Sequence, residues 1–380
     1  MSTHTLLTQT LMKIFVTLEL GISLPLRRML AILVACLLEG VAAHLTALAE
    51  ALPELDATAT AKEQRIRRFL SNHRLCPVMI LPLILFLLQP ILAALPEIVI
   101  CMDRTHWQKR QCDVNILMVA LAFQGRAIPL FWIVFDRAGN SSLQDWKKVL
   151  APVIEALQKL DSLKDKPIIV TADREFASPK LSEWLKTKYQ VESALRLKRS
   201  SYLKHEDVCI QLGELLQYFP KETTRFYPNI TITQSSHFPM NVLITWGKTY
   251  QEPLIVATTF QDSNRSLQHY QQRFGIEPMF KDDKSNGFDV QNTKVTDPKR
   301  IENLWIPIAI AHAFSTLEGY RKEQQGETKF INISGKLKRP VGLFLVGLKS
   351  FKQWIRRASA KVFRNFLNNF FLFINQPIRV

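Results

Sequence analysis

The order of apolar and amphipathic segments between residues 97 and 197 is the feature that most constrains how this chain can fold. Three short apolar runs come first, and Gly125 with Arg126 between the second and third indicates a hairpin. Helical and strand-like segments then alternate, which gives the order β-β-β-α-β-α-β and predicts an α/β core. The strand-like runs cover residues 98–102, 114–123, 127–135, 167–172 and 191–197, and the helical segments cover 142–160 and 178–188.

The segments outside this stretch differ in composition and hydrophobic pattern, and together they divide the chain into five parts. Residues 199–250 are polar with short alternating runs, which predicts a β-rich insertion. A strand at 254–259 and helices at 265–280 and 303–320 follow it. The predicted parts are a helical N-terminal domain (1–95), the first part of the core (96–198), the insertion (199–250), the second part of the core (251–325) and a basic, aromatic C-terminal region (326–380).

The run from residue 78 to residue 95 is almost wholly apolar and raises the question of a membrane span. Pro82 and Pro90 lie inside it, and closely spaced prolines break a continuous helix. We therefore expect a buried segment made of short helical pieces, and no membrane anchor. Residues 1–13 do not read as a signal peptide. The five cysteines are scattered without a Cys-x-x-Cys pair, which fits a reducing cytoplasm.

Positive charge dominates the chain, since 49 Lys and Arg against 33 Asp and Glu leave a net charge of +16. Such a surplus calls for a polyanionic partner, either nucleic acid or an anionic membrane surface. One basic cluster lies on a helix that Thr60 and Glu63 are expected to open as a capping box. Its residues Arg65 and Arg68 have two interpretations that stay open: a solvated face, or contact with DNA phosphates.

The C-terminal region is also positively charged, and almost no acidic residues balance its Lys and Arg residues. No acidic residue follows Glu327, whereas eleven Lys or Arg lie between Lys329 and Arg379, interleaved with aromatic residues. One interpretation is an amphipathic helix packed on the body with a solvated basic face. So many like charges without a counter-charge favour contact with phosphates instead.

Two aspartates directly follow apolar runs, Asp103 after residues 98–102 and Asp173 after residues 168–172. Carboxylates in such places lie at a sheet edge where Mg²⁺ can reach them. Two such ions about 3.5 to 4 Å apart activate a water and stabilise a leaving oxygen at phosphorus. Asp136 also closes an apolar run. If the fourth strand pairs beside the first, Asp173 lies about 5 Å from Asp103, whereas Asp136 lies two strands away, about 10 Å.

A third carboxylate is expected from Glu277, in the pattern Tyr270-x-x-Arg273-x-x-x-Glu277-x-x-x-x-x-x-Lys284. These offsets place the side chains on one helical face. A phenol, a guanidinium, a carboxylate and an ammonium group on one face suit a surface that grips a phosphate and supplies one metal ligand. Pro278 is expected to kink the helix just after Glu277 and to turn Lys284 elsewhere.

The sequence resembles the DDE transposases of bacterial insertion sequences, in the cut-and-paste branch marked by a Tyr-(2)-Arg-(3)-Glu-(6)-Lys signature. The pattern above matches that spacing at every position. The segments Asp103-Arg-Thr-His-Trp107 and Asp173-Arg-Glu-Phe176 look like the two Asp motifs of the family. The resemblance covers about residues 60–320, and the order Asp, Asp, β-rich insertion, Glu agrees with it.

The resemblance implies a ribonuclease H-like fold, a mixed sheet flanked by helices, with an N-terminal DNA-binding domain and a C-terminal helical part used in dimerisation. It implies that Asp103, Asp173 and Glu277 hold two Mg²⁺ ions, for which Mn²⁺ can substitute. The other three residues of the signature would hold the phosphate backbone near the transposon end. The partners would be double-stranded DNA, as terminal inverted repeats and target, and a second copy of the chain in the synaptic complex. The setting would be the bacterial nucleoid.

The reaction that the resemblance implies is hydrolysis that frees a 3′-hydroxyl, followed by a hairpin on the element end and strand transfer into target DNA. Relatives that form the hairpin can carry a Trp on the strand before the Glu helix, and residues 254–259 contain none. Trp246, on the preceding strand, is a candidate substitute for stacking on a flipped base, although a core role in the insertion is favoured. Two rival functions stay open: a non-catalytic DNA-binding protein, such as an inactivated or domesticated transposase, and a peripheral membrane protein that uses the basic C-terminus.

Overall fold

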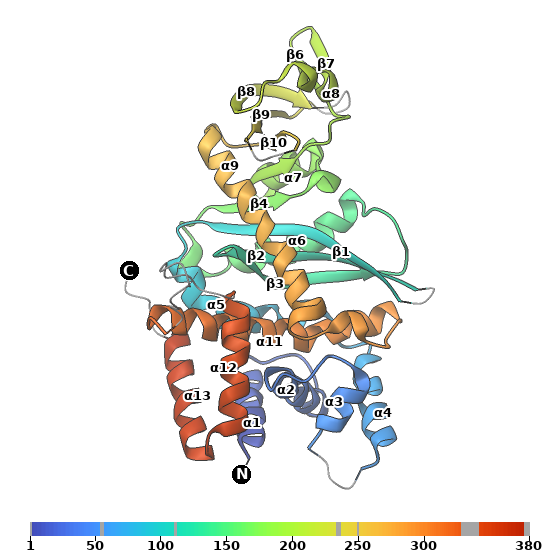
Figure 1. Cartoon of the computed structure of the whole chain (residues 1–380), viewed down its shortest axis with the longest axis vertical. Coiled ribbons are helices and arrows are strands. Elements are labelled where there is room, and N and C mark those ends of the chain that lie inside the picture. Colours follow the sequence, from blue (N-terminus) through green and yellow to red (C-terminus); the bar gives the residue numbers. More distant parts are fainter. Residues whose placement is uncertain are drawn as a thin grey trace.

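A mixed β-sheet forms the spine of the molecule, with a helical body at one end and a β-rich tip at the other (Figure 1). The structure is a computed structural model that describes residues 2–53, 57–109, 112–232, 237–248, 251–327 and 342–375. Its strands are β1 (Ile98–Lys109), β2 (Cys112–Phe123), β3 (Arg126–Phe135), β4 (Ile168–Ala172), β5 (Glu192–Arg196), β6 (Tyr202–His205), β7 (Val208–Gln211), β8 (Thr223–Ile232), β9 (Pro239–Trp246) and β10 (Leu254–Thr258). Within the described residues they pair in the order β3-β2-β1-β4-β5-β10-β9-β8-β6-β7.

The first half of this order is the ribonuclease H-like arrangement that the resemblance implies. β1, β2 and β3 form an antiparallel meander, and β4 and then β5 join β1 in parallel. Parallel neighbours need long connections. These are supplied by α6 (Leu143–Gln158) and α7 (Pro179–Tyr189), which pack on one face of the sheet. The predicted order β-β-β-α-β-α-β is confirmed.

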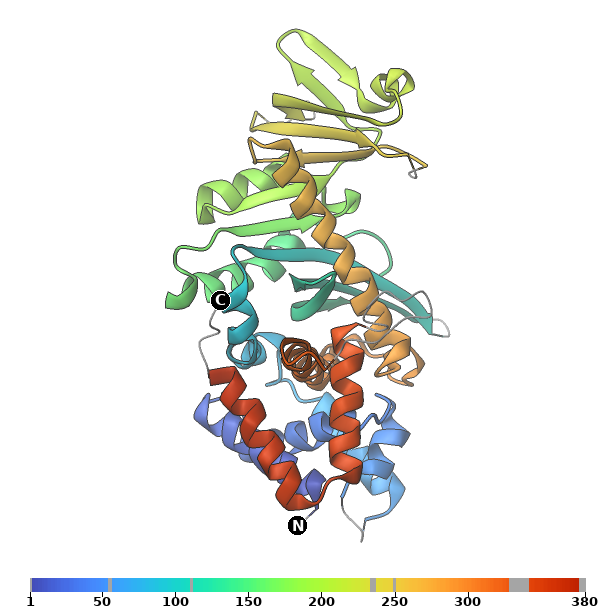
Figure 2. The ribbon, with the colours of Figure 1, turned by 60° about the vertical axis from the view of Figure 1, so that its left-hand side comes forward.

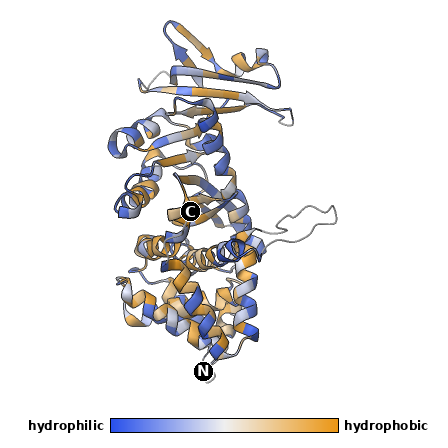
Figure 3. Ribbon diagram, turned by 90° about the vertical axis from the view of Figure 1, so that its left-hand side faces the viewer, coloured by the Kyte–Doolittle hydropathy of each residue, from blue (hydrophilic) through white to orange (hydrophobic). Residues whose placement is uncertain are grey.

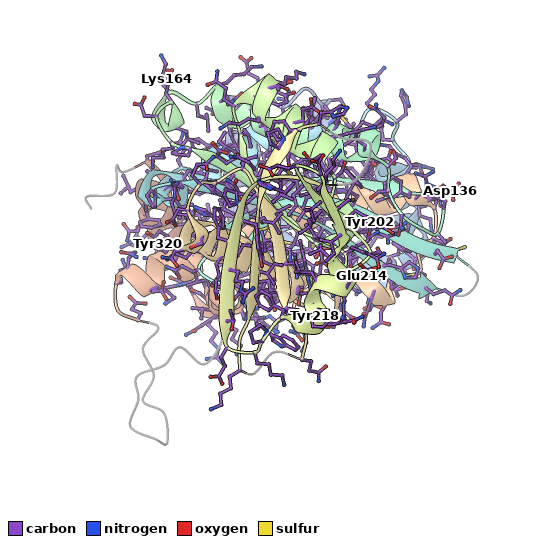
Figure 4. The ribbon with its side chains drawn as sticks, turned by 90° about the horizontal axis from the view of Figure 1, so that it is seen from above. Asp136, Lys164, Tyr202, Glu214, Tyr218 and Tyr320 are labelled. Carbon is purple, nitrogen blue, oxygen red and sulfur yellow. The ribbon has the colours of Figure 1, made fainter. Side chains whose placement is uncertain are left out.

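The insertion does not form a separate layer but lengthens the same sheet. β10 joins β5, and β9, β8, β6 and β7 follow outward from it. A short helix, α8 (Leu212–Leu215), covers one side of these strands and shares a small hydrophobic cluster with them. The side chains of Tyr202, Glu214 and Tyr218 lie on this tip when the molecule is viewed from above (Figure 4).

The helical body combines segments from both ends of the chain around one buried helix. α11 is buried along most of its length, and its core is continuous with that of the sheet and of the surrounding helices (Figure 3). The division into domains therefore stays a prediction, because the N-terminal helices share this core. The helices are α1 (Thr3–Thr17), α2 (Leu24–Leu38), α3 (Leu45–Ala51), α4 (Ala59–Leu70), α5 (Leu81–Ala94), α11 (Pro298–Gln324), α12 (Leu343–Arg357) and α13 (Ala360–Asn375).

One stretch of the described residues, Pro77–Ala94, is long and apolar enough to cross a membrane. Of its residues 61% are buried inside the protein, where it packs on α11 and α13, which fits the predicted core segment. The predicted break into short pieces is wrong. After a 3-10 turn (Pro77–Ile80), α5 runs through Pro90 without interruption, and Pro82 lies in its first turn, where a missing N–H costs nothing.

The start of α4 differs from the prediction because a different residue provides the cap. α4 begins at Ala59, since the hydroxyl of Thr58 accepts from the backbone N–H of Ala61; the expected box from Thr60 to Glu63 is not the cap. After α2, the next helix, α3, begins only at Leu45. Residues beside Gly40, whose φ is +87°, turn the chain first.

The C-terminal helices show what their aromatic residues do. α12 and α13 are amphipathic helices that pack on α11 and α1, and their large aromatic side chains fill the interface between them. The basic side chains face outward. Residues 328–341 and 376–380, which carry five of the eleven basic residues, lie outside the described residues. The aromatic side chains buried here are Phe344, Phe351, Phe363, Phe366 and Phe370.

Candidate active site

Parallel pairing of β1 with β4 brings Asp103 and Asp173 together. The paired residues end at Met102 and Ala172, and each aspartate is the next residue of its segment. Adjacent strands lie about 4.8 Å apart, so the two carboxyl groups start from neighbouring backbone positions. The strand order on which their proximity depended is confirmed.

Asp103 lies inside β1 and not after it, contrary to the sequence-based expectation. Residues 104–109 continue the strand by pairing with residues 112–117 of β2 after β4 has ended. These residues are mostly polar, so an apolar run could not reveal them. From Asp103 onward, β1 therefore pairs with β2 alone.

Asp136 is not part of the site. It follows β3, which is separated from β1 by β2, and its side chain is exposed. Figure 4 shows it at the edge of the molecule, as the two-strand separation predicted.

The third acidic residue comes from a helical segment that crosses the sheet on the face away from α6 and α7 (Figure 2). This segment consists of α9 (Ser263–Gln272), a 3-10 turn (Arg273–Gly275), α10 (Ile276–Lys281) and a π-turn (Asp282–Asn286). The sequence predicts one helix over residues 265–280 with a kink after Glu277. Instead the break comes before Glu277, and Pro278 lies in the first turn of α10, where it is tolerated.

Three residues of the signature converge on the aspartates. The guanidinium of Arg273 donates to Asp103 Oδ2 over 2.9 Å and to Glu277 Oε1 over 2.7 Å. The hydroxyl of Tyr270 lies 3.4 Å from Asp173 Oδ1. Asp103 and Glu277 therefore contact the same cationic group, which places the third carboxylate near Asp103.

Asp173 has a cationic partner that sequence reasoning missed. Arg196, the last residue of β5, places Nη1 3.6 Å from Asp173 Oδ1. Its Nη2 donates to Glu252 Oε1 over 2.7 Å, and Arg174 donates to the same oxygen over 2.9 Å. No local pattern marks Arg196, because β5 is partly polar and its neighbours depend on the strand order.

Burial and the neighbouring charges shift the pKa values of the ionisable side chains in the site. Burial raises the pKa of Asp103 to about 6, with Arg273 opposing the shift and the neighbouring carboxylates adding to it. Burial likewise raises the pKa of Tyr270 to about 12, so its phenol stays a neutral donor. Burial alone would lower the pKa of Arg273, but Tyr270 and the acidic residues raise it above its ordinary value.

Lys284 lies farther along β1 than the other residues of the signature. Its Nζ is 3.3 Å from Thr105 Oγ1 and 5.3 Å from the centre of the Trp107 ring. Thr105 is two residues from Asp103 and thus on the same face of the strand. Lys284 is therefore on the face of the carboxylates without touching them, and burial lowers its pKa.

A family model described as the transposase DDE domain matches residues 95–314, more than half of the chain. That stretch runs from just before β1 into α11 and contains all three carboxylates. The chain belongs to the transposase DDE domain family. No curated protein matches the sequence. Members of this family bind DNA and take part in DNA recombination.

DDE transposases use divalent metal ions, and the donor set of this chain suits them. Three carboxylates are the hard oxygen donors that such ions prefer. Among the residues that the structure describes, no three His, Cys, Asp or Glu side chains are close enough to hold an ion as they stand. The guanidinium of Arg273 supplies the positive charge between Asp103 and Glu277 instead.

The remaining candidate residues of the transposase lie away from the carboxylates. Arg65 and Arg68 are exposed on α4, whose Ile66 and Phe69 are buried. Trp246 ends β9 and packs partly against the hydrophobic cluster of the insertion, with Lys221 Nζ 5.6 Å from its ring centre. β9 lies three strands from β4, so the strand spacing alone separates Trp246 from Asp173 by at least roughly 14 Å.

Proposed function

We propose that the protein is an active DNA transposase that moves an insertion sequence by cut-and-paste transposition. The observation that carries this proposal is that Asp103 lies beside Asp173 on the neighbouring segment and shares the guanidinium of Arg273 with Glu277. The three carboxylates come from three separate parts of a chain that belongs to the family. The spacing of Tyr270, Arg273, Glu277 and Lys284 supports the branch with the Tyr-Arg-Glu-Lys signature.

The three carboxylates would hold two Mg²⁺ ions, for which Mn²⁺ can substitute. When bound, such a pair activates a water and stabilises the leaving oxygen at phosphorus. Asp103 must lose its proton to act as a ligand, and its raised pKa of about 6 still permits this at neutral pH. Arg273, once it releases a carboxylate, can donate to a phosphate in the same fork geometry. Tyr270 remains protonated and can donate from the other side.

The partner is double-stranded DNA, first as the terminal inverted repeats of the element and then as the target. Lys284 reaches a position two residues beyond Asp103 on β1, which suits a phosphate flanking the one that reacts. Arg65 and Arg68 on α4 offer exposed positive charge for a more distant contact. The exposed basic face of α12 and α13 offers another. We further propose a homodimer in the synaptic complex and a cytoplasmic location at the nucleoid.

Alanine substitution tests the metal assignment. Purified protein with Mg²⁺ and DNA that carries the terminal repeats of the element should cleave at the repeat ends. Asp103→Ala, Asp173→Ala and Glu277→Ala should each lower cleavage by about a thousandfold or more, because each removes a metal ligand. Cleavage by all three variants at the rate of the parent would show that the assignment is wrong.

A non-catalytic DNA-binding protein is the alternative function. It would bind the same DNA with a steep dependence on salt and cut it with neither Mg²⁺ nor Mn²⁺. Flotation with anionic vesicles in the absence of any DNA affinity would point to a peripheral membrane protein instead. For the hairpin step, Trp246→Ala should reduce hairpin formation without reducing the first nick if Trp246 stacks on a flipped base.

A further inference from the structure

Directly behind the two aspartates, an ion pair links the segments that carry them. Arg104 follows Asp103 on β1, and Glu175 lies two residues after Asp173 in a 3-10 turn (Arg174–Phe176). Successive side chains of a strand point to opposite faces, so Arg104 lies on the face of β1 away from Asp103. Each Asp motif thus supplies one carboxylate to the site and one charged residue to the opposite side.

The contacts of this pair are close and partly shielded from water. Arg104 donates to Glu175 Oε2 from Nη2 over 2.9 Å and from Nε over 3.0 Å, and both side chains are 19% exposed. The other oxygen of Glu175 accepts from the backbone N–H and the hydroxyl of Ser141, over 3.2 and 3.1 Å. The hydroxyl of Ser141 in turn accepts from Trp146 Nε1 on α6 over 2.8 Å. Glu175 is therefore anchored to the start of α6.

Arg104 is anchored just as firmly on its own side. It also donates to the carbonyl of Gly139 and lies 3.4 Å from Oδ1 of Asn115. Asn115 is fully buried on β2 and donates to the carbonyls of Arg137 and Gly139. The ion pair is thus one link in a network that joins β1, β2, the loop before α6 and the segment after β4.

The position of this link suggests what it does. Backbone pairing between β1 and β4 ends at Met102 and Ala172, one residue before each aspartate. Past that point the Arg104–Glu175 contact continues the connection between the two segments. We propose that Arg104 and Glu175 are positioning residues that fix the separation of Asp103 and Asp173, and thereby set the affinity of the site for a divalent cation. This inference rests on the proposed function.

The test is Mn²⁺ binding to the full-length protein, measured by calorimetry and by the loss of the free-ion electron paramagnetic resonance signal. Glu175→Gln keeps the size of the side chain and an acceptor for Ser141 but removes the charge. We expect it to weaken Mn²⁺ binding about tenfold or more, as partners of metal ligands commonly do. Arg104→Lys keeps the charge and loses the two-nitrogen contact, so its loss should be smaller than that of Arg104→Gln.

The matched control is Arg137→Gln. Arg137 lies in the loop before α6 and forms an ion pair of 3.1 Å with Asp145 at the start of α6, and it touches neither Asp motif. This control should leave Mn²⁺ affinity within twofold of the parent. If Glu175→Gln and Arg104→Gln lower the melting temperature but keep parental Mn²⁺ affinity, the pair only stabilises the fold and the inference fails. If Glu175→Gln does not fold, the two Arg104 variants decide in the same way.

Asp173→Asn separates this failure from failure of the proposed function. Loss of Mn²⁺ binding in Asp173→Asn, together with parental binding in the Arg104 and Glu175 variants, would overturn the positioning role alone. Parental binding in Asp173→Asn as well would overturn the metal site itself.

Discussion

Each aspartate of the candidate site is paired with an arginine from another part of the chain. Asp103 contacts Arg273, and Asp173 contacts Arg196. A buried carboxylate without such a partner would be costly, because removal from water disfavours its charge. The arginines thus allow acidic residues to lie close together without a metal ion. At Asp103 the effect of burial on the pKa is larger than that of Arg273, so the pKa rises to about 6.

The raised pKa of Asp103 predicts how metal binding depends on pH. A carboxyl group with a pKa of about 6 is mostly ionised at pH 7 and mostly protonated at pH 5, and a metal ion must compete with that proton. Mn²⁺ affinity should therefore fall about tenfold from pH 7 to pH 5, measured by titration calorimetry. In Asp103→Asn, whatever weaker binding remains should lose this dependence. A flat affinity in the parent protein across this range would contradict the shift.

At the scale of elements, the sequence predicts the core well and the site only in part. The apolar runs that become most of β2 and all of β4 are buried on both faces, so their composition alone marks them. The extension of β1 past Met102 depends on pairing with β2, which composition does not show. Likewise the contact between Arg196 and Asp173 depends on which strands become neighbours, and no local pattern specifies that.

The break between α9 and α10 depends on one glycine. A Cβ on Gly275 would lie 2.5 Å from the carbonyl oxygen of Arg126, at the start of β3. Backbone cannot yield as a flexible side chain can, so the 3-10 turn must stay this close for Arg273 to contact both Asp103 and Glu277. A larger residue would push the turn off the sheet.

Gly275→Ala should therefore damage both the fold and the site. Overpacking of this kind costs about 1–3 kcal/mol, which thermal unfolding would detect. DNA cleavage at a temperature where the variant is folded should fall at least tenfold. The control is Gly21→Ala, whose added Cβ would meet the flexible end of Met79 at 3.6 Å, an ordinary contact. Equal behaviour of the two variants would contradict the importance of this close approach.

At the scale of the whole molecule, both ends of the chain build one helical body behind the catalytic sheet. α1 and α2 pack with α11, α12 and α13, so the terminal segments depend on each other for burial. The aromatic residues of α12 and α13 take the inner face, which leaves the outer face of the described helices basic. Sequence alone allowed two interpretations of this region, and the packing shows that its aromatic residues face the protein core.

The basic outer face predicts a measurable share of DNA binding. Lys349, Lys352 and Lys361 are exposed, and replacing all three with Gln should leave folding unchanged. If each contacts one phosphate, the slope of log affinity against log salt should become shallower by about 2.7. A control triple with the same change in charge, Lys159, Lys164 and Lys180 to Gln, lies around α6 and α7 (Figure 4 labels Lys164). Equal slopes for the two triples would contradict a specific role of α12 and α13.

The continuous sheet also fixes the distance between the candidate site and the outermost hairpin, β6–β7. Six strand-to-strand steps separate β4 from β7, and at about 4.8 Å each they amount to roughly 29 Å. A duplex that lies along the sheet rises 3.4 Å per base pair, so this reach corresponds to about eight or nine base pairs. If the DNA of the proposed reaction lies along the sheet, a contact made by the outermost hairpin would be held at a set number of base pairs from the phosphate that is cut.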